Sequence, residues 1–169
     1  KALVWGMLAA IAIAFLLRVP FLNSPPYSQH TWRQAITLTV AENFYEEDMN
    51  LFTPRVNQRF DGDGITGSQF PLYEWLLAGT YHVFGKEFWI ARIWSFLWTI
   101  LGALAILHIA NRWWNNEAVA FTAFVFFLFS PEVFYDGWIA LPDLMALALV
   151  LWGYVAFGRY RERGKNIHW

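Results

Sequence analysis

The sequence predicts an all-α polytopic membrane protein, with about four transmembrane helices and one long external loop. Of the 169 residues, 57% are apolar and only 15% are charged, and aromatic residues reach 20%. Ordinary soluble domains are much less apolar and less aromatic than this. The second observation is that the apolar residues gather in long segments, several of them long enough to cross a bilayer. Both observations disfavour a soluble globular domain.

Four segments are candidates for transmembrane spans. A bilayer core of about 30 Å requires roughly 17 to 25 helical residues. The first segment reaches this length if Arg18 extends its side chain to the interface. The third reaches it only with Trp113 and Trp114 before it and residues 130–133 after it. The expected spans are residues 1–22, 88–110, 113–133 and 138–157.

Residues 23–87 form the long loop between the first two spans. Residues 31–47 are expected to form an amphipathic surface helix, because apolar side chains recur there at spacings of three and four. Those side chains are Trp32, Ala35, Ile36, Thr39, Val40 and Phe44. Residues 70–84 are apolar but short and contain Glu74, which favours a helix that dips into the interface without crossing.

Basic residues orient the chain, because Lys and Arg collect in short loops on the cytoplasmic side. With four crossings, Lys1, Arg112 and the cluster after the last span all fall on one side. That cluster consists of Arg159, Arg161, Arg163 and Lys165. The N-terminus is therefore expected in the cytoplasm and the long loop outside, which is the periplasm if the membrane is a bacterial inner membrane. A further span is expected after the basic cluster, so residues 1–169 are interpreted as the N-terminal part of a longer, truncated chain.

Composition also disfavours several classes of function. The net charge of −1 provides no electrostatic basis for binding nucleic acid. Cysteine is absent, which excludes disulfides, thiolate metal sites and a cysteine nucleophile. We find no zinc-ligand spacing, no glycine-rich phosphate loop and no Ser-His-Asp arrangement. Hydrolase and nucleotidase functions are therefore disfavoured.

A series of short motifs runs through most of the chain. They are Ser68-Gln69-Phe70-Pro71-Leu72-Tyr73-Glu74-Trp75-Leu76-Leu77, Val83-Phe84-Gly85-Lys86-Glu87-Phe88, Ala91-Arg92-Ile93, Ser130-Pro131-Glu132 and Leu141-Pro142-Asp143. In this order, after a first span and a long external loop, they resemble the N-terminal part of membrane glycosyltransferases of the GT-C type. The resemblance is to the protein mannosyltransferase, aminoarabinose transferase and RgtA/B-like group.

The resemblance implies a cavity open to the external face that holds a polyprenyl-phosphate sugar as donor. Inverting transfer to a lipid, glycan or protein acceptor requires a carboxylate as general base, and cationic or metal-bound groups at the departing phosphate. A divalent cation is thus compatible with the function, although no residue pattern requires a cofactor or identifies metal ligands. The alternative is a non-catalytic membrane subunit that packs against other membrane subunits in a larger complex.

Three residues are candidates for catalysis. His30 is a candidate general base, because histidine often performs this role, although an interfacial histidine is also a common hydrogen-bonding residue. Glu74 is ionisable within an apolar segment, which is typical of a side chain that lines a cavity or has a partner. Asp143 begins the last helix, where the helix dipole alone favours a carboxylate. Relatives carry an acidic residue just after the first span, but residues 27–34 contain none.

Candidates for binding the donor phosphate are mainly cationic or amide side chains. Arg33 and the neighbouring Gln34 begin the surface helix, where Arg33 either clamps phosphate or anchors the helix at the interface. Gln69 stands near the place where relatives often have a charged residue before the proline. Arg92, at the external end of the second span, either replaces that charge or extends to the interface.

Asp61 and Asp63 form an Asp-Gly-Asp-Gly turn that exposes two carboxylates. Such a turn binds a cation or a sugar hydroxyl, or it is simply a solvated turn. If the assignments above are correct, His30, Arg33, Glu74 and Asp143 converge on one externally facing cavity near the membrane surface.

Overall fold

The computed structural model describes residues 1–27, 29–67 and 69–164. These residues are mainly α-helical, and the one β-type pairing among them is an isolated bridge between Arg55 and Ile65. The prediction of an all-α protein is therefore confirmed. Ser68 of the first motif and Lys165 of the basic cluster lie outside the described residues.

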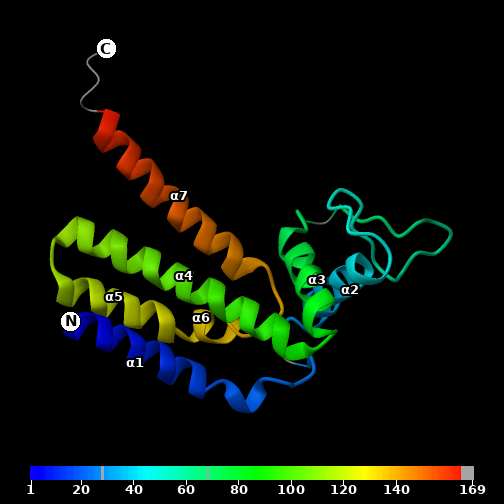
Figure 1. Ribbon diagram of the computed structural model, residues 1–169, viewed down its shortest axis with the longest axis horizontal. Helices are drawn as coiled ribbons and strands as arrows, with labels where there is room; N and C mark the ends of the chain where they lie inside the picture. The colour runs from blue at the N-terminus through cyan, green and yellow to red at the C-terminus, as the bar shows by residue number, and fades with distance from the viewer. Residues whose placement is uncertain (28, 68, 165–169) are drawn as a thin grey trace. The chain divides into compact units, whose positions relative to one another are not determined.

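The chain divides into two compact units, whose helices are labelled in Figure 1. The span unit comprises Lys1–Val19, Phe96–Gly137 and the chain from Asp143 onward. The loop unit comprises Pro20–Ser95 and Trp138–Pro142. Helix α4 (Phe88–Trp114) begins in the loop unit and continues into the span unit.

The span unit is built from α1 (Ala2–Leu16), most of α4, α5 (Glu117–Phe129), α6 (Pro131–Asp136) and α7 (Asp143–Gly164). Small residues lie where these helices meet. A Cβ atom at Gly6 of α1 would lie 3.2 Å from the Phe121 ring of α5, and one at Gly102 of α4 would lie 3.1 Å from the Phe127 ring. Membrane helices use such small residues to approach closely.

The helices of the span unit alternate in direction along the chain. Arg112, near the end of α4, donates to the Gly158 carbonyl at 3.1 Å and pairs with Glu162 at 2.7 Å, both near the end of α7. The start of α1 adjoins the start of α5 (Figure 1). Basic residues thus collect at these helix ends, an arrangement compatible with the orientation expected from the positive-inside rule.

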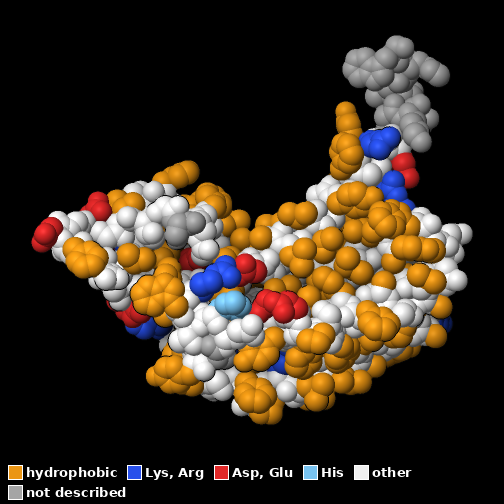
Figure 2. Space-filling model, turned by 180° about the vertical axis from the view of Figure 1, so that it is seen from behind, with side chains coloured by type: hydrophobic (Ala, Val, Ile, Leu, Met, Phe, Trp, Pro, Cys, Tyr) orange, Lys and Arg blue, Asp and Glu red, His pale blue; other side chains and the backbone are white. Residues whose placement is uncertain are grey.

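Two helical segments among the described residues are long and apolar enough to cross a membrane, Ala2–Phe21 and Phe88–Trp114. The second has 27 residues, which at 1.5 Å each gives about 40 Å. Helix α5 is apolar but shorter. Hydrophobic side chains also cover much of the helical surface seen in Figure 2. These findings support membrane helices, while the count of four crossings stays a prediction.

Several helix bounds differ from the expected spans. The third expected span, 113–133, is divided into α5 and α6 at Ser130, which has extended φ and ψ angles of −60° and 137°. Pro131 causes this break, because proline lacks an N–H and disfavours helical geometry in the residue before it. Helix α4 continues past residue 110 to Trp114, and α7 begins at Asp143 rather than at 138.

Arg18 does not extend toward the interface as expected, and it is only 2% exposed. Its guanidinium donates to the Phe134 carbonyl at 2.7 and 3.0 Å and to the Ala14 carbonyl at 2.8 Å. It also lies 3.7 Å from the centre of the Phe134 ring. The expectation was wrong because a cation in an apolar segment is stabilised by carbonyl and aromatic partners inside the protein. Arg18 therefore fastens α6 to the end of α1.

The loop unit is centred on α2 (Thr31–Glu46) and α3 (Leu72–Phe84), which pack against each other, with the short helix η1 (Val19–Phe21) at the end of α1. The expected surface helix is thus present, but its buried face differs from the expected stripe. Trp32 is 72% exposed and Ala35 is exposed, whereas Gln34 and Thr37 are buried.

Gln34 and Thr37 lie in the first half of α2, and the buried face of the second half is mainly apolar, apart from Asn43, whose amide donates to the Arg55 carbonyl. Val40 and Phe44 pack with Ala78 of α3 and with partly buried neighbours. Lys86, after α3, pairs with Glu42 and with Glu46 of α2, the latter at 2.9 Å. The pair of helices is therefore held by an apolar contact and by an exposed ion-pair cluster at its edge.

Candidate functional site

Glu74 is the most deeply buried acidic residue among the candidates, with 1% of its surface exposed. It lies in the first turn of α3. The Gln69 amide donates to its Oε1 atom, whereas Oε2 is buried and has no hydrogen-bond partner among the described residues. Burial raises the pKa of the Glu74 carboxyl, and the neighbouring Gln69 and Thr37 side chains oppose that effect. The structure thus brings together two candidates, Gln69 and Glu74.

Three polar side chains hold the short segment Trp138–Pro142 within the loop unit. Arg92 donates to the Trp138 carbonyl at 2.8 Å, Ser95 donates to the Ile139 carbonyl at 2.6 Å, and the Gln34 carbonyl oxygen accepts from the Ala140 N–H at 3.3 Å. All three side chains are buried. We call this set, Gln34, Arg92 and Ser95, the backbone clamp.

The clamp is supported from α3 by a tyrosine. The Tyr73 hydroxyl lies 2.9 Å from Ser95 Oγ and 3.1 Å from the Ala91 carbonyl. Because the Ser95 proton goes to Ile139, Ser95 Oγ accepts from the Tyr73 hydroxyl, whose single proton is shared between Ser95 Oγ and the Ala91 carbonyl. Burial raises the pKa of the Tyr73 phenol, which keeps it protonated as this donor. A continuous hydrogen-bonded path therefore runs from Tyr73 of α3 through Ser95 of α4 to the Ile139 carbonyl.

Two predicted phosphate-binding residues belong to this clamp. Arg92 also donates to the Ser24 carbonyl at 2.7 Å, and the Gln34 amide nitrogen donates to the Gln29 carbonyl at 2.9 Å. Each of these two side chains thus binds backbone groups of two different segments, the segment 138–142 and the loop before α2. A role for Gln34 or Arg92 in binding phosphate stays a prediction, and a structural role is what their contacts indicate.

Asp143 is the first residue of α7 and is exposed. It directly follows the clamped segment in the sequence and belongs to the span unit. A carboxylate in the first helical turn is favoured by the helix dipole. Its exposure also leaves it accessible to a substrate.

His30 and Arg33 lie at the start of α2, and both are exposed. His30 precedes the helix with left-handed backbone angles, φ 58° and ψ 32°. This conformation is uncommon in residues other than glycine, although histidine is among those that adopt it more often. The geometry of His30 therefore ends the preceding loop and starts α2, and its catalytic role stays a prediction.

Asp61 and Asp63 lie in an exposed turn of the loop unit. Asp63 Oδ1 accepts from the Ile65 N–H at 3.1 Å, as in a turn closed by an aspartate side chain. Gly64 has φ +76°, and a Cβ there would lie 2.6 Å from the Val56 carbonyl. This turn therefore has a local structural cause, and its role in binding a sugar or a cation stays a prediction.

Several residues that organise this region were not among the sequence candidates. Ser95 and Thr37 lie outside the motifs identified in the sequence, and Tyr73 lies within one. Nothing local identifies the partners of these three residues, because those partners are distant in the sequence. Arg18 did have a signal, because a cation within an apolar span normally has a partner inside the protein. Among the described residues, no three His, Asp, Glu or Cys side chains come together in a way that could hold a metal ion.

Comparison with known proteins identifies a family for this chain. No curated protein and no solved structure matches the chain. The family model described as dolichyl-phosphate-mannose-protein mannosyltransferase matches residues 68–169, which is more than half of the chain. The matched region includes α3, α4 and the helices that follow, and it supports the GT-C type indicated by the motifs. The chain therefore belongs to the dolichyl-phosphate-mannose-protein mannosyltransferase family of membrane glycosyltransferases.

Proposed function

We propose that the protein transfers a sugar from a polyprenyl-phosphate donor to a lipid, glycan or protein acceptor on the external face of the membrane. The family match over residues 68–169 is the observation that carries this proposal. The apolar helices Ala2–Phe21 and Phe88–Trp114 support a location in the bilayer, where the donor's isoprenoid tail is soluble. In this proposal the membrane is a bacterial inner membrane, the chain crosses it four times, and the long loop faces the periplasm.

In the proposed reaction Asp143 is the general base. It takes a proton from the acceptor as that group attacks the anomeric carbon, and the sugar–phosphate bond breaks with inversion. Asp143 is favoured because it is exposed, whereas the Glu74 carboxyl is buried. Glu74 has a positioning role. It accepts a hydrogen bond from Gln69, a candidate phosphate-binding residue, and so holds that side chain beside the start of α3. Arg33, or a divalent cation, stabilises the charge on the departing phosphate.

The clamp has a positioning role in this proposal. Its hydrogen bonds determine the path of Trp138–Pro142, the five residues directly before Asp143. A catalytic group must be held close to its productive geometry. A rigid backbone in the segment before Asp143 therefore helps to position the Asp143 carboxylate. His30 is the second candidate for the base, because it lies at the start of α2 and is exposed.

The alternative is a non-catalytic membrane subunit. The observation in its favour is the lack of any carboxylate in residues 27–34, where relatives have an acidic residue. Such a subunit would retain the helices and the clamp while another chain performs the chemistry.

The proposal is tested by the choice of donor. Proteoliposomes containing the full-length protein are supplied with an isotopically labelled sugar, either as polyprenyl phosphate or as nucleotide sugar, with an acceptor-lipid or membrane-protein extract. We expect label to enter the acceptor from the polyprenyl phosphate only, with inversion of the anomeric centre by NMR. Transfer from the nucleotide sugar alone contradicts the proposed donor. Absence of transfer from either source, together with co-purification of another membrane protein, supports the subunit.

A further inference from the structure

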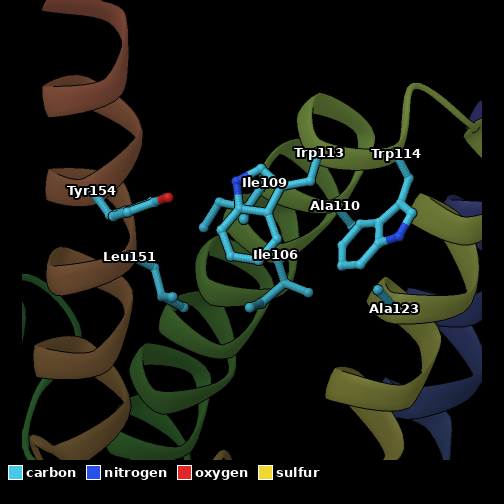
Figure 3. A pocket seen from close by; sticks show the side chains of 8 residues that line it. All are labelled: Ile106, Ile109, Ala110, Trp113, Trp114, Ala123, Leu151 and Tyr154. Carbon is cyan, nitrogen blue, oxygen red and sulfur yellow. The ribbon is translucent and has the colours of Figure 1, made fainter. Parts of the chain in front are cut away.

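Two of the cavities in the structure differ in how far their linings identify an occupant. A groove of about 420 Å³ lies in the span unit between α4, α5 and α7 (Figure 3). Every side chain that lines it is aliphatic or aromatic, so the groove identifies no occupant. A cavity of about 210 Å³ lies within the loop unit and has a mixed lining. We call it the loop cavity, and its lining consists of Leu38, Glu42, Tyr81, Lys86, Glu87 and Phe88.

Three elements form the walls of the loop cavity. Leu38 and Glu42 lie one helical turn apart on α2, Tyr81 lies on α3, and residues 86–88 turn from α3 into α4. The Lys86 ammonium pairs with the Glu42 carboxylate and, at 2.9 Å, with that of Glu46. These ion pairs hold the turn against α2, so the walls of the cavity are already in place without a ligand.

Tyr81 is the buried polar residue of the loop cavity. Its side chain is only 3% exposed, and its ring packs edge-to-face against Tyr45. Burial raises the pKa of the Tyr81 phenol, and the nearby Glu42 carboxylate raises it further, so the hydroxyl keeps its proton. That hydroxyl has no hydrogen-bond partner in the part of the chain that the structure describes. Because buried polar groups normally have a partner, this hydroxyl indicates a ligand in the cavity.

We propose that the loop cavity binds one neutral sugar unit. The Tyr81 hydroxyl donates to a sugar oxygen, and the carboxylates of Glu42 and Glu87 accept from sugar hydroxyls. The Phe88 ring provides a flat apolar surface for the C–H groups of the sugar ring. Pockets for drug-sized ligands begin at about 300 Å³, so the volume of about 210 Å³ suits a single monosaccharide unit. This binding site goes beyond the transfer reaction proposed above and does not depend on it.

The charges of the lining favour a neutral ligand. The two carboxylates of Glu42 and Glu87 outnumber the one ammonium of Lys86, which disfavours an anion. A cationic ligand would compete with Lys86 for Glu42. No metal is implied either, since no three His, Asp, Glu or Cys side chains of the described residues come together to hold one. Hydroxyl groups suit both kinds of charge, because they donate to carboxylates and accept from an ammonium group and a phenol.

The test is sugar binding by the full-length protein, purified in a detergent without a sugar headgroup and measured without any donor. Saturation-transfer NMR titrations give the dissociation constants of the methyl α-glycosides of glucose, mannose and galactose, and of charged glucosamine and glucuronate. We expect at least one neutral glycoside to bind, and to bind more tightly than both charged sugars. Absence of binding by all three neutral glycosides overturns the proposal, and so does tighter binding of a charged sugar.

Substitution of one hydroxyl locates the site. Tyr81→Phe should weaken binding about three- to tenfold, the effect of one hydrogen bond. Its stability should equal that of the wild type, because the hydroxyl has no partner among the described residues. Tyr45→Phe is the matched control, because Tyr45 packs against Tyr81 but does not line the cavity, and its binding should be unchanged. Equal weakening in both variants contradicts the assignment.

A second variant separates this site from any other sugar site on the protein. Glu87 lines the loop cavity and is exposed, so Glu87→Gln leaves the pairs of Lys86 with Glu42 and Glu46 in place. We expect at least about tenfold weaker binding, since a hydrogen bond to a charged group is lost. If Tyr81→Phe and Glu87→Gln both bind the glycoside as tightly as the wild type, the sugar occupies a different site and the proposal is wrong.

Discussion

Substitution of Ser95 by alanine tests the clamp most simply, because it removes one hydroxyl and adds nothing. Ser95 Oγ donates to the Ile139 carbonyl at 2.6 Å and lies 2.9 Å from the Tyr73 hydroxyl, and the side chain is 1% exposed. The variant therefore loses two buried hydrogen bonds. It does not leave either partner bare, because the Ile139 carbonyl also accepts from the Leu141 N–H at 2.9 Å, and Tyr73 retains the Ala91 carbonyl at 3.1 Å.

The expected loss of stability follows from the number of hydrogen bonds that the substitution removes. A buried hydrogen bond contributes about 0.5–1.5 kcal/mol net, so Ser95→Ala should lower the free energy of unfolding by about 1–3 kcal/mol. Tyr73→Phe removes only the bonds of its own hydroxyl and leaves the Ser95–Ile139 bond intact, so about 0.5–1.5 kcal/mol is expected. The double variant should cost less than the sum of the two, because the bond between Tyr73 and Ser95 is lost only once.

The measurement is denaturant unfolding of the full-length protein in a mild detergent, with the three variants compared under identical conditions. For a chain of this size, each kcal/mol also shifts the melting temperature by roughly 2–4 °C. A Ser95→Ala variant as stable as the wild type would refute the claim that the clamp stabilises the fold. So would a Tyr73→Phe variant that is destabilised more than Ser95→Ala.

Three further predictions concern helix packing, a buried acid and a surface ion-pair cluster. Gly137→Ala should destabilise by about 1–3 kcal/mol, because its Cβ would lie 2.2 Å from Thr99 Oγ1 and 2.6 Å from the Val133 carbonyl. Gly153→Ala, with nothing within 4 Å, should stabilise by about 0.5–1 kcal/mol, and unfolding of both variants checks the difference. The raised pKa of Glu74 means that the folded protein holds this proton to higher pH than the unfolded chain. Stability should therefore fall as pH rises from about 4.3 toward that raised pKa, and Glu74→Gln should remove this fall in an unfolding series from pH 4 to 8. Lys86→Met should cost less than about 1 kcal/mol and the difference should vanish in 1 M salt, because its pairs with Glu42 and Glu46 are exposed. A cost that persists at high salt would contradict this reading.

Local sequence patterns were sufficient to predict the two helices of the loop unit. The recurrence of apolar residues placed a helix at 31–47, and the structure has Thr31–Glu46. The same spacing correctly placed Val40 and Phe44 in the core, but it was wrong for Trp32 and Ala35, which are exposed, because it assumed that the whole partner surface would be apolar. Thr37 is buried beside Glu74 of α3. Gln34 is buried because its side chain binds the Ala140 N–H and the Gln29 carbonyl.

The remaining misses concern breaks in helices and distant partners. The division of the third span was detectable, since Ser130-Pro131 is a known signal for a helix end. The clamp was not detectable, because Ser95 and Ile139 are 44 residues apart and Arg92 and Trp138 are 46 apart. Arg18 and Phe134, 116 residues apart, present the same difficulty. A local pattern identifies a polar residue in an apolar segment, but only the tertiary fold identifies its partner.

The central claim is that an external carboxylate performs glycosyl transfer, and Asp143→Asn tests it most directly. Glu132→Gln is the matched control, because Asp143 and Glu132 are both exposed and both lie in the first turn of a helix. Loss of either charge therefore removes a similar interaction with the helix dipole, about 0.3–1 kcal/mol.

The measurement is the rate of transfer of labelled sugar from polyprenyl phosphate in membranes that contain the full-length protein, normalised to the amount inserted. We predict that Asp143→Asn lowers this rate at least a hundredfold, the usual contribution of a general base, while Glu132→Gln stays within about twofold of the wild type. An Asp143→Asn variant that transfers sugar at the wild-type rate would contradict the account.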